Sequence, residues 1–121
     1  MIKDIKAALD SKSCETERGL AFLDVLNVVS GKWKMVLICI IQQDKLRFSV
    51  IQKLIPEISP RMLSRELKEL ELNGIVKRTM YDTKPVTIEY SITDSAKELV
   101  PIIMEMVAWG VGHRQKNIIR K

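Results

Sequence analysis

Residues 59–74 read SPRMLSRELKELELNG, and this stretch carries unusually clear helix boundaries. Ser59 can accept a hydrogen bond from a free amide of the first turn, and Pro60 lacks an amide that would have no helical partner there. Asn73-Gly74 supplies the matching end, because glycine readily takes the left-handed conformation that terminates helices. The sequence therefore predicts a capped helix from Ser59 to Asn73.

The side chains of this helix fall into two groups when they are placed at about 100° per residue. Three leucines cluster on one side and predict a buried face. Arginine can donate two hydrogen bonds to a guanine edge, whereas lysine and serine suit phosphate oxygens. The opposite side holds Arg61, Ser64, Arg65 and Lys68, with Ser59 at the phosphate-attracting N-terminus. The alternative is an ordinary solvated face with pairs such as Arg65–Glu69.

The flanking segments favour DNA binding over that alternative. Residues 47–55 predict a short helix with Phe48, Ile51, Leu54 and Ile55 facing inward, and a tight connection at 56–58 completes a helix-turn-helix. Residues 75–81 and 86–92 alternate like strands around a turn-rich tip at 82–85, which predicts a hairpin or wing. From Lys45 to Lys84, nine Lys or Arg stand against five Asp or Glu, an excess of four. We expect contacts to phosphate or the minor groove from Arg47, Lys77, Arg78 and Lys84. A plain surface hairpin is the alternative for the wing.

The remaining segments are predicted to be helical. Ile2, Ile5 and Leu9 indicate a short amphipathic helix that ends near residues 11–13, and a second helix runs over about 16–29. Residues 33–42 are apolar almost all round, which is typical of the buried centre of a bundle. Thr93 is expected to cap a long helix through about His113. The fold class is therefore mainly α with a small β-hairpin, a winged helix-turn-helix with added N- and C-terminal dimerisation helices. We expect one domain, with the first dimerisation helix in 1–13, the core in 14–92 and the second helix and tail in 93–121.

The C-terminal helix has an apolar stripe wider than a domain of this size needs. Together with the N-terminal helix it predicts a hydrophobic homodimer interface, unless both helices cover the monomer's own core. A two-fold dimer would set two reading helices about one DNA turn apart and predicts a near-palindromic operator. The stripe consists of Leu99, Ile102, Ile103, Met106, Val107 and Trp109.

Composition sets the broad class. The chain has 121 residues, 46% of them hydrophobic and 29% charged, with a formal net charge of +5. We expect no secretory leader, no membrane partner and a cytoplasmic location, because the N-terminus lacks an apolar region and the run 35–41 is too short to span a bilayer. His113 is the sole histidine and no known catalytic motif occurs. We therefore expect no metal, no cofactor and no enzymatic activity.

Several motifs in register resemble the HxlR-type branch of the MarR-like winged-helix regulators. The resemblance implies a bacterial or archaeal transcription factor that dimerises through its terminal helices, inserts the 59–73 helix into the major groove and uses the hairpin as the wing. The motifs span about Cys14 to Gly110 and comprise Gly31-Lys32-Trp33, Arg47-Phe48-Ser49, Ile58-Ser59-Pro60-Arg61-Met62-Leu63, Leu67-Lys68-Glu69-Leu70-Glu71, Asn73-Gly74-Ile75-Val76-Lys77-Arg78, the segment 86–93 and Trp109-Gly110.

The resemblance also implies a role for Cys14. A cysteine commonly precedes the first core helix in this family, and some members use it to sense oxidants or electrophiles. A helix start favours thiolate, whereas Glu15, in place of the usual proline, and Glu17 oppose it. Cys14 is thus either a redox sensor or a passive thiol, and Cys39 is expected to be an inert core residue.

The predicted function is transcriptional regulation through double-stranded DNA, with repression as the default because no activation domain is visible. Two other classes stay open. The winged helix could serve purely as a protein-interaction module, or the protein could be a sensor of a small molecule or oxidant whose DNA binding is secondary.

Overall fold

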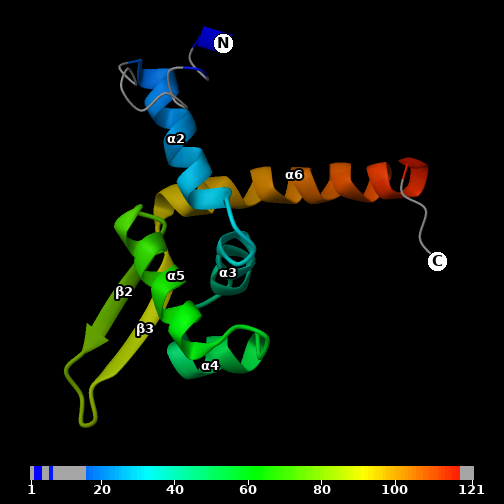
Figure 1. Ribbon diagram of the computed structural model, residues 1–121. Helices are drawn as coiled ribbons and strands as arrows, with labels where there is room; N and C mark the ends of the chain where they lie inside the picture. The colour runs from blue at the N-terminus through cyan, green and yellow to red at the C-terminus, as the bar shows by residue number, and fades with distance from the viewer. Residues whose placement is uncertain (1, 4–5, 7–15, 118–121) are drawn as a thin grey trace.

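The computed structural model describes residues 2–3, 6 and 16–117. Helices pack on one side of a small antiparallel sheet whose two long strands project as a wing, and the last helix extends far from the rest (Figure 1). This arrangement is a winged helix-turn-helix, as predicted. The predicted N-terminal helix, including Ile5 and Leu9, falls mainly outside the described residues. The elements are α2 (Glu17–Val29), α3 (Lys34–Ile41), β1 (Leu46–Arg47), α4 (Phe48–Leu54), α5 (Pro60–Leu72), β2 (Val76–Tyr81), β3 (Thr87–Ile92) and α6 (Asp94–Asn117).

Helix α3 is the centre of the core. It contacts α2, α5, α6 and β3, and Leu37, Ile38 and Ile41 are fully buried. An apolar helix without a polar face needs neighbours on several sides, since its burial is what stabilises it. The prediction of a central helix is confirmed.

Helix α5 begins and ends where its sequence indicates. The Ser59 hydroxyl accepts a hydrogen bond from the Met62 amide at 3.1 Å, and Pro60 occupies the first position. At the other end Gly74 has a φ of +73°, which glycine tolerates without strain. The Ile75 amide then donates to the Leu70 carbonyl at 2.9 Å, so the chain reverses tightly into β2.

The sheet has three strands in the order β1-β3-β2, all antiparallel. The predicted hairpin is confirmed, with Val76 opposite Ile92 and Tyr81 opposite Thr87. The edge strand β1 was not predicted, because two residues are too few to show an alternating pattern. This strand pairs Arg47 with Glu89, so the start of the helix-turn-helix is tied to the wing.

The short helix α4 follows β1 directly. Ile51 and Ile55 are buried and Phe48 packs against the core, as expected. The prediction that Leu54 faces inward is wrong, because its side chain is 58% exposed. Viewed along the helix axis, Leu54 lies about 60° to one side of Ile51, whereas Phe48 and Ile55 lie on the other side. The buried arc therefore excludes Leu54. The Gln52 side-chain amide donates to the Ile58 carbonyl and holds the turn between α4 and α5.

Thr93 caps α6, as predicted, by accepting a hydrogen bond from the Ala96 amide at 3.2 Å. The helix continues through Pro101 to Asn117, slightly beyond the expected end. Ile103 is buried, whereas Trp109 further along is 69% exposed on the projecting part (Figure 1). Within the described part of the chain, no helix is long and apolar enough to cross a membrane.

Candidate nucleic-acid interface

Helix α5 presents its basic side chains on one outer face. Leu63, Leu67 and Leu70 are buried in the core. The predicted site residues of this helix all lie exposed on the other side, and this group is named the basic face: Ser59, Arg61, Ser64, Arg65 and Lys68. The structure therefore brings together on one rigid, capped helix every α5 residue that the sequence singled out.

Two acidic residues of α5, Glu66 and Glu69, turn toward α3, whereas Glu71 stays exposed at the edge of the basic face beside Ser64. Glu69 forms an ion pair with Lys34 of α3, with 2.8 Å between Nζ and Oε2, and Oε2 of Glu66 lies 3.9 Å from the same ammonium. The carboxylate of Glu69 thus bonds across helices and does not form the pair with Arg65 that the alternative of a solvated face would contain. Among the described residues, no carboxylate forms an ion pair with Arg61, Arg65 or Lys68. Three cations of α5 are left available for an external anion.

Lys34 is a residue that the sequence reasoning missed. It lies at the start of an apolar helix, and nothing in its local sequence pairs it with residues 32 and 35 positions later. Its hydrogen bond and positive charge hold the pKa of Glu69 below its ordinary value, with a smaller contribution from Arg65. The lysine therefore ties one edge of α5 to α3 at a partly exposed site.

The side chain of Arg65 is held across one turn of α5. Its Nη2 donates to Sδ of Met62 at 3.2 Å. A thioether is a weak acceptor, so this contact orients the guanidinium at little cost when a stronger acceptor replaces it. The guanidinium of Arg65 is therefore already partly oriented before it would bind a base or phosphate.

The basic residues of the wing divide between the two faces of the sheet. Successive side chains of a strand point to opposite faces, so Lys77 and Arg78 are separated. Arg78 shares its face with Val76 and Ile92, which join the α5 leucines in the core. Lys77 lies on the outer face, which it shares with Arg47 of the neighbouring edge strand.

Lys84 lies exposed in the tip of the wing. The Thr83 hydroxyl donates to the Pro85 carbonyl at 2.7 Å and lies 2.9 Å from the Thr87 hydroxyl. These contacts hold the turn between β2 and β3. The three-stranded sheet and its tip therefore carry one cation on the core-facing side, one at the tip and two on the outer face.

The remaining candidates contribute little to this surface. Cys14 lies outside the described residues. Cys39 is half-buried in α3, where burial raises the pKa of its thiol. In residues 16–117, no three His, Cys, Asp or Glu side chains are grouped to hold a metal ion.

Comparison with known proteins identifies the family. The model of the HxlR-like helix-turn-helix family matches residues 28–118. The chain belongs to this family. An HTH-type transcriptional regulator from Methanothermobacter thermautotrophicus is 40% identical over 94 residues, which cover 76% of this chain and 72% of that protein. The protein is thus a helix-turn-helix transcriptional regulator of the HxlR-like family.

Two solved structures of regulators share the fold. The redox regulator HypR in its oxidised form matches with a TM-score of 0.67 and 40% identity, covering 73% of this chain and 91% of that one. Quinone-bound YodB from Bacillus subtilis matches with a TM-score of 0.67 and 29% identity, covering 76% and 97%. The first of these structures is an oxidised form and the second a quinone-bound form of its regulator.

The Lys34–Glu69 pair predicts a specific pH dependence of stability. Because the pKa of Glu69 is lowered in the folded protein, its contribution is present above the ordinary glutamate pKa and is lost as pH falls through the lowered value. Glu69→Gln should reduce the free energy of unfolding at pH 7, and the difference from the unaltered protein should shrink between about pH 5 and pH 3. Urea titrations of both proteins at each pH measure this difference in the free energy of unfolding.

Glu71→Gln is the matched control, because Glu71 is exposed on the same helix and forms no ion pair with Lys34. It should leave the acid limb of the stability curve almost unchanged. A constant difference between Glu69→Gln and the unaltered protein from pH 7 to pH 3 would contradict the assigned role of the pair.

Proposed function

We propose that this HxlR-like regulator binds double-stranded DNA sequence-specifically as a homodimer and represses transcription in the cytoplasm. The observation that carries the proposal is the basic face of α5, which is rigid, capped and free of internal ion pairs among the described residues. A helix of this kind fits the major groove, whose base edges match bidentate side chains. We also propose a single winged-helix domain with terminal dimerisation helices in 1–13 and 93–121.

The proposed contacts follow from side-chain chemistry and position. Arg61 and Arg65 would bind base edges, because a guanidinium can donate two parallel hydrogen bonds to guanine. Ser59, Ser64 and Lys68 would contact bases or phosphates along the same groove. Phosphate or minor-groove contacts are proposed for Arg47, Lys77, Arg78 and Lys84, with Arg78 on the core-facing side of the sheet, Lys84 at the tip and the other two on the outer face.

The homodimer proposal is supported by the projecting half of α6. Its apolar side chains are exposed well beyond the core, which is uncommon for a monomer in water. The exposed group comprises Ile102, Met104, Met106, Val107, Trp109 and Val111. Two copies that bury this surface around a two-fold axis would place two α5 helices on one face of DNA.

Selection of binding sites from random duplex DNA tests the function directly. A dimeric regulator should enrich an inverted repeat whose half-sites lie about one helical turn apart. A folded protein that enriches no sequence and shows no salt-dependent affinity for duplex DNA would contradict the proposal. That outcome would favour the alternative of a winged-helix module that binds another protein.

The two kinds of contact should respond differently to substitution. Arg65→Ala should weaken cognate binding by about 1–3 kcal/mol and relax the preference at one base position. Lys84→Ala should weaken binding to all sequences and reduce the slope of log affinity against log salt by about 1. Fluorescence anisotropy with cognate and random duplexes at several salt concentrations measures both effects.

Lys97→Ala serves as the charge control, since Lys97 is exposed on α6 and pairs with Asp94 at 3.5 Å. It should change neither the sequence preference nor the salt slope. If Arg65→Ala weakened the affinity for cognate and random DNA equally, the assignment of Arg65 to a base edge would be contradicted.

Val107→Glu tests the dimer interface. Val107 is 53% exposed on α6, and a carboxylate buried without a partner costs several kcal/mol. The variant should weaken self-association by at least about tenfold, as measured by sedimentation equilibrium. Gln115→Glu adds the same charge to an exposed position nearer the helix end and should leave the dimer intact. An unchanged dimer in Val107→Glu would place the interface elsewhere.

Regulation through Cys14 is a second proposal, supported by the likeness to HypR in its oxidised form and to quinone-bound YodB. We propose that oxidants or electrophiles modify Cys14 and change DNA affinity. Burial raises the pKa of Cys39, so that thiol holds little reactive thiolate at neutral pH. Cys14→Ser should abolish the response of DNA binding to diamide or a quinone, whereas Cys39→Ser should retain it. A response that persists in Cys14→Ser would refute the assignment.

A further inference from the structure

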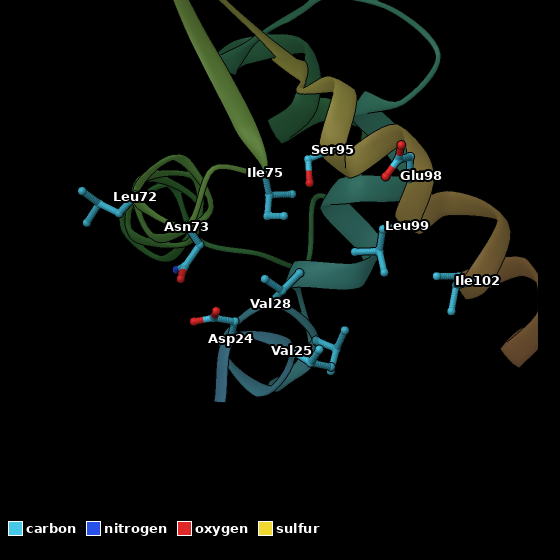
Figure 2. Close-up of a pocket in the computed structure, with 11 residues that line it drawn as sticks. Asp24, Val25, Val28, Leu72, Asn73, Ile75, Ser95, Glu98, Leu99 and Ile102 are labelled. Atoms are coloured by element: carbon cyan, nitrogen blue, oxygen red, sulfur yellow. The ribbon is translucent and has the colours of Figure 1, made fainter. Parts of the chain in front are cut away.

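A cavity of about 550 Å³ lies between α2, the C-terminal end of α5 and α6. Figure 2 shows Val28, Ile75 and Leu99 forming its apolar wall, with side chains from three separate elements turned toward one space. This volume is in the range of sites that hold small organic ligands. Val25 leaves apolar surface exposed at the edge of the cavity, and Ile102 at the same edge adjoins the α6 surface that is proposed to be buried in the homodimer. The lining therefore favours an occupant with an apolar body.

The charges around the cavity have a single sign. Asp24 of α2 and Glu98 of α6 are its ionisable lining groups, and Asn73 and Ser95 are its neutral polar ones. No Lys, Arg or His contributes to the described lining. Figure 2 shows Asp24 and Glu98 on opposite sides of the apolar wall. Over the described part of the chain, neither carboxylate has a hydrogen bond or ion pair.

We infer that this cavity binds an organic cation that carries an apolar body. A cation gains from two unpaired carboxylates beside apolar surface, whereas an organic anion of the same shape is repelled by both. The basic face of α5 repels cations. A cationic ligand would therefore be attracted to the acidic cavity and not to the surface that is proposed to bind DNA.

The cavity shares part of its wall with the turn that ends α5. Asn73 and Ile75 line it and flank Gly74. The Gly74 carbonyl accepts from the Thr93 hydroxyl at 2.7 Å, and the Ile75 carbonyl accepts from the Thr93 amide at 3.0 Å. A ligand that changes the spacing of α2 and α6 would therefore act on the joint that positions α5. Occupancy of the cavity changes DNA affinity through this joint, a step that rests on the proposed function.

Calorimetry without DNA tests the site by itself, with benzyltriethylammonium as the probe and benzyl alcohol and benzoate as neutral and anionic counterparts. The cation should bind one per chain, at least about tenfold more tightly than benzoate. Asp24→Asn and Glu98→Gln should each weaken it about two- to fivefold, as expected for partly exposed charge pairs. Asp44→Asn, which removes an exposed carboxylate away from this cavity, should leave binding unchanged.

Equal binding of benzoate and the cation, or unchanged affinity in both carboxylate variants, would overturn the site. So would a result in which the two variants alter only self-association, because a second copy of the chain would then fill the cavity. Anisotropy with the selected operator tests the coupling: saturating cation should change DNA affinity by at least about threefold, and Asp24→Asn with Glu98→Gln should remove that change. Binding of the cation without any change in DNA affinity would refute the coupling, whereas failure to bind any DNA would refute the proposed function and leave the calorimetric result standing.

Discussion

Burial of Leu63, Leu67 and Leu70 against α3 fixes the rotation of α5 about its axis. A buried leucine is worth about 1.5–3 kcal/mol relative to an exposed one, so turning three of them outward would cost an amount comparable with the whole stability of a typical small domain. Because successive helix positions are separated by about 100°, one buried stripe determines what the opposite side presents. The position of every side chain of the basic face therefore depends on packing inside the core.

The Lys34 ion pair reinforces this constraint by chemistry. A salt bridge at a partly exposed site contributes little to stability, and its greater effect here is to decide where two carboxylates lie. Glu66 and Glu69 are drawn toward α3. The outer side of α5 then carries three cations and two hydroxyls, with Glu71 as an exposed carboxylate at its edge. A helix whose sequence carries both charge signs thus acquires a face on which cations predominate.

The predictable parts of the fold were those encoded over short distances. Ser59 and Gly74 mark the ends of α5 through local hydrogen bonds and backbone freedom, and the leucine spacing identifies the buried side. The same holds for Thr93, which caps α6. In each case the residues that carry the signal are within four positions of the group they bond, so no knowledge of tertiary structure is required.

The features that escaped prediction depend on contacts between distant segments. Strand β1 exists because β3 offers it an edge, and two residues alone contain no period. The partner of Lys34 was hidden because helices α3 and α5 are brought together only by the fold. Lys77 and Arg78 looked equivalent as adjacent cations, whereas the pleat sends them to opposite faces. Leu54 was misassigned since a seven-residue helix contains too few positions to define its buried arc.

Thr93 makes three hydrogen bonds, two of which connect the start of α6 to the turn that ends α5. Its hydroxyl caps α6 and donates to the Gly74 carbonyl, while its amide bonds to Ile75. The start of α6 is therefore joined to the end of α5 without an intervening flexible loop. In a homodimer held by α6, the crossing angle of the two α6 helices would set the separation of the two α5 helices, because this joint links α5 to α6 in each copy. Half-site spacing is sensitive to such changes because both helices must enter the groove at once. A ligand or a modified cysteine that shifts α6 by a small angle would then alter DNA affinity without touching any residue that contacts DNA.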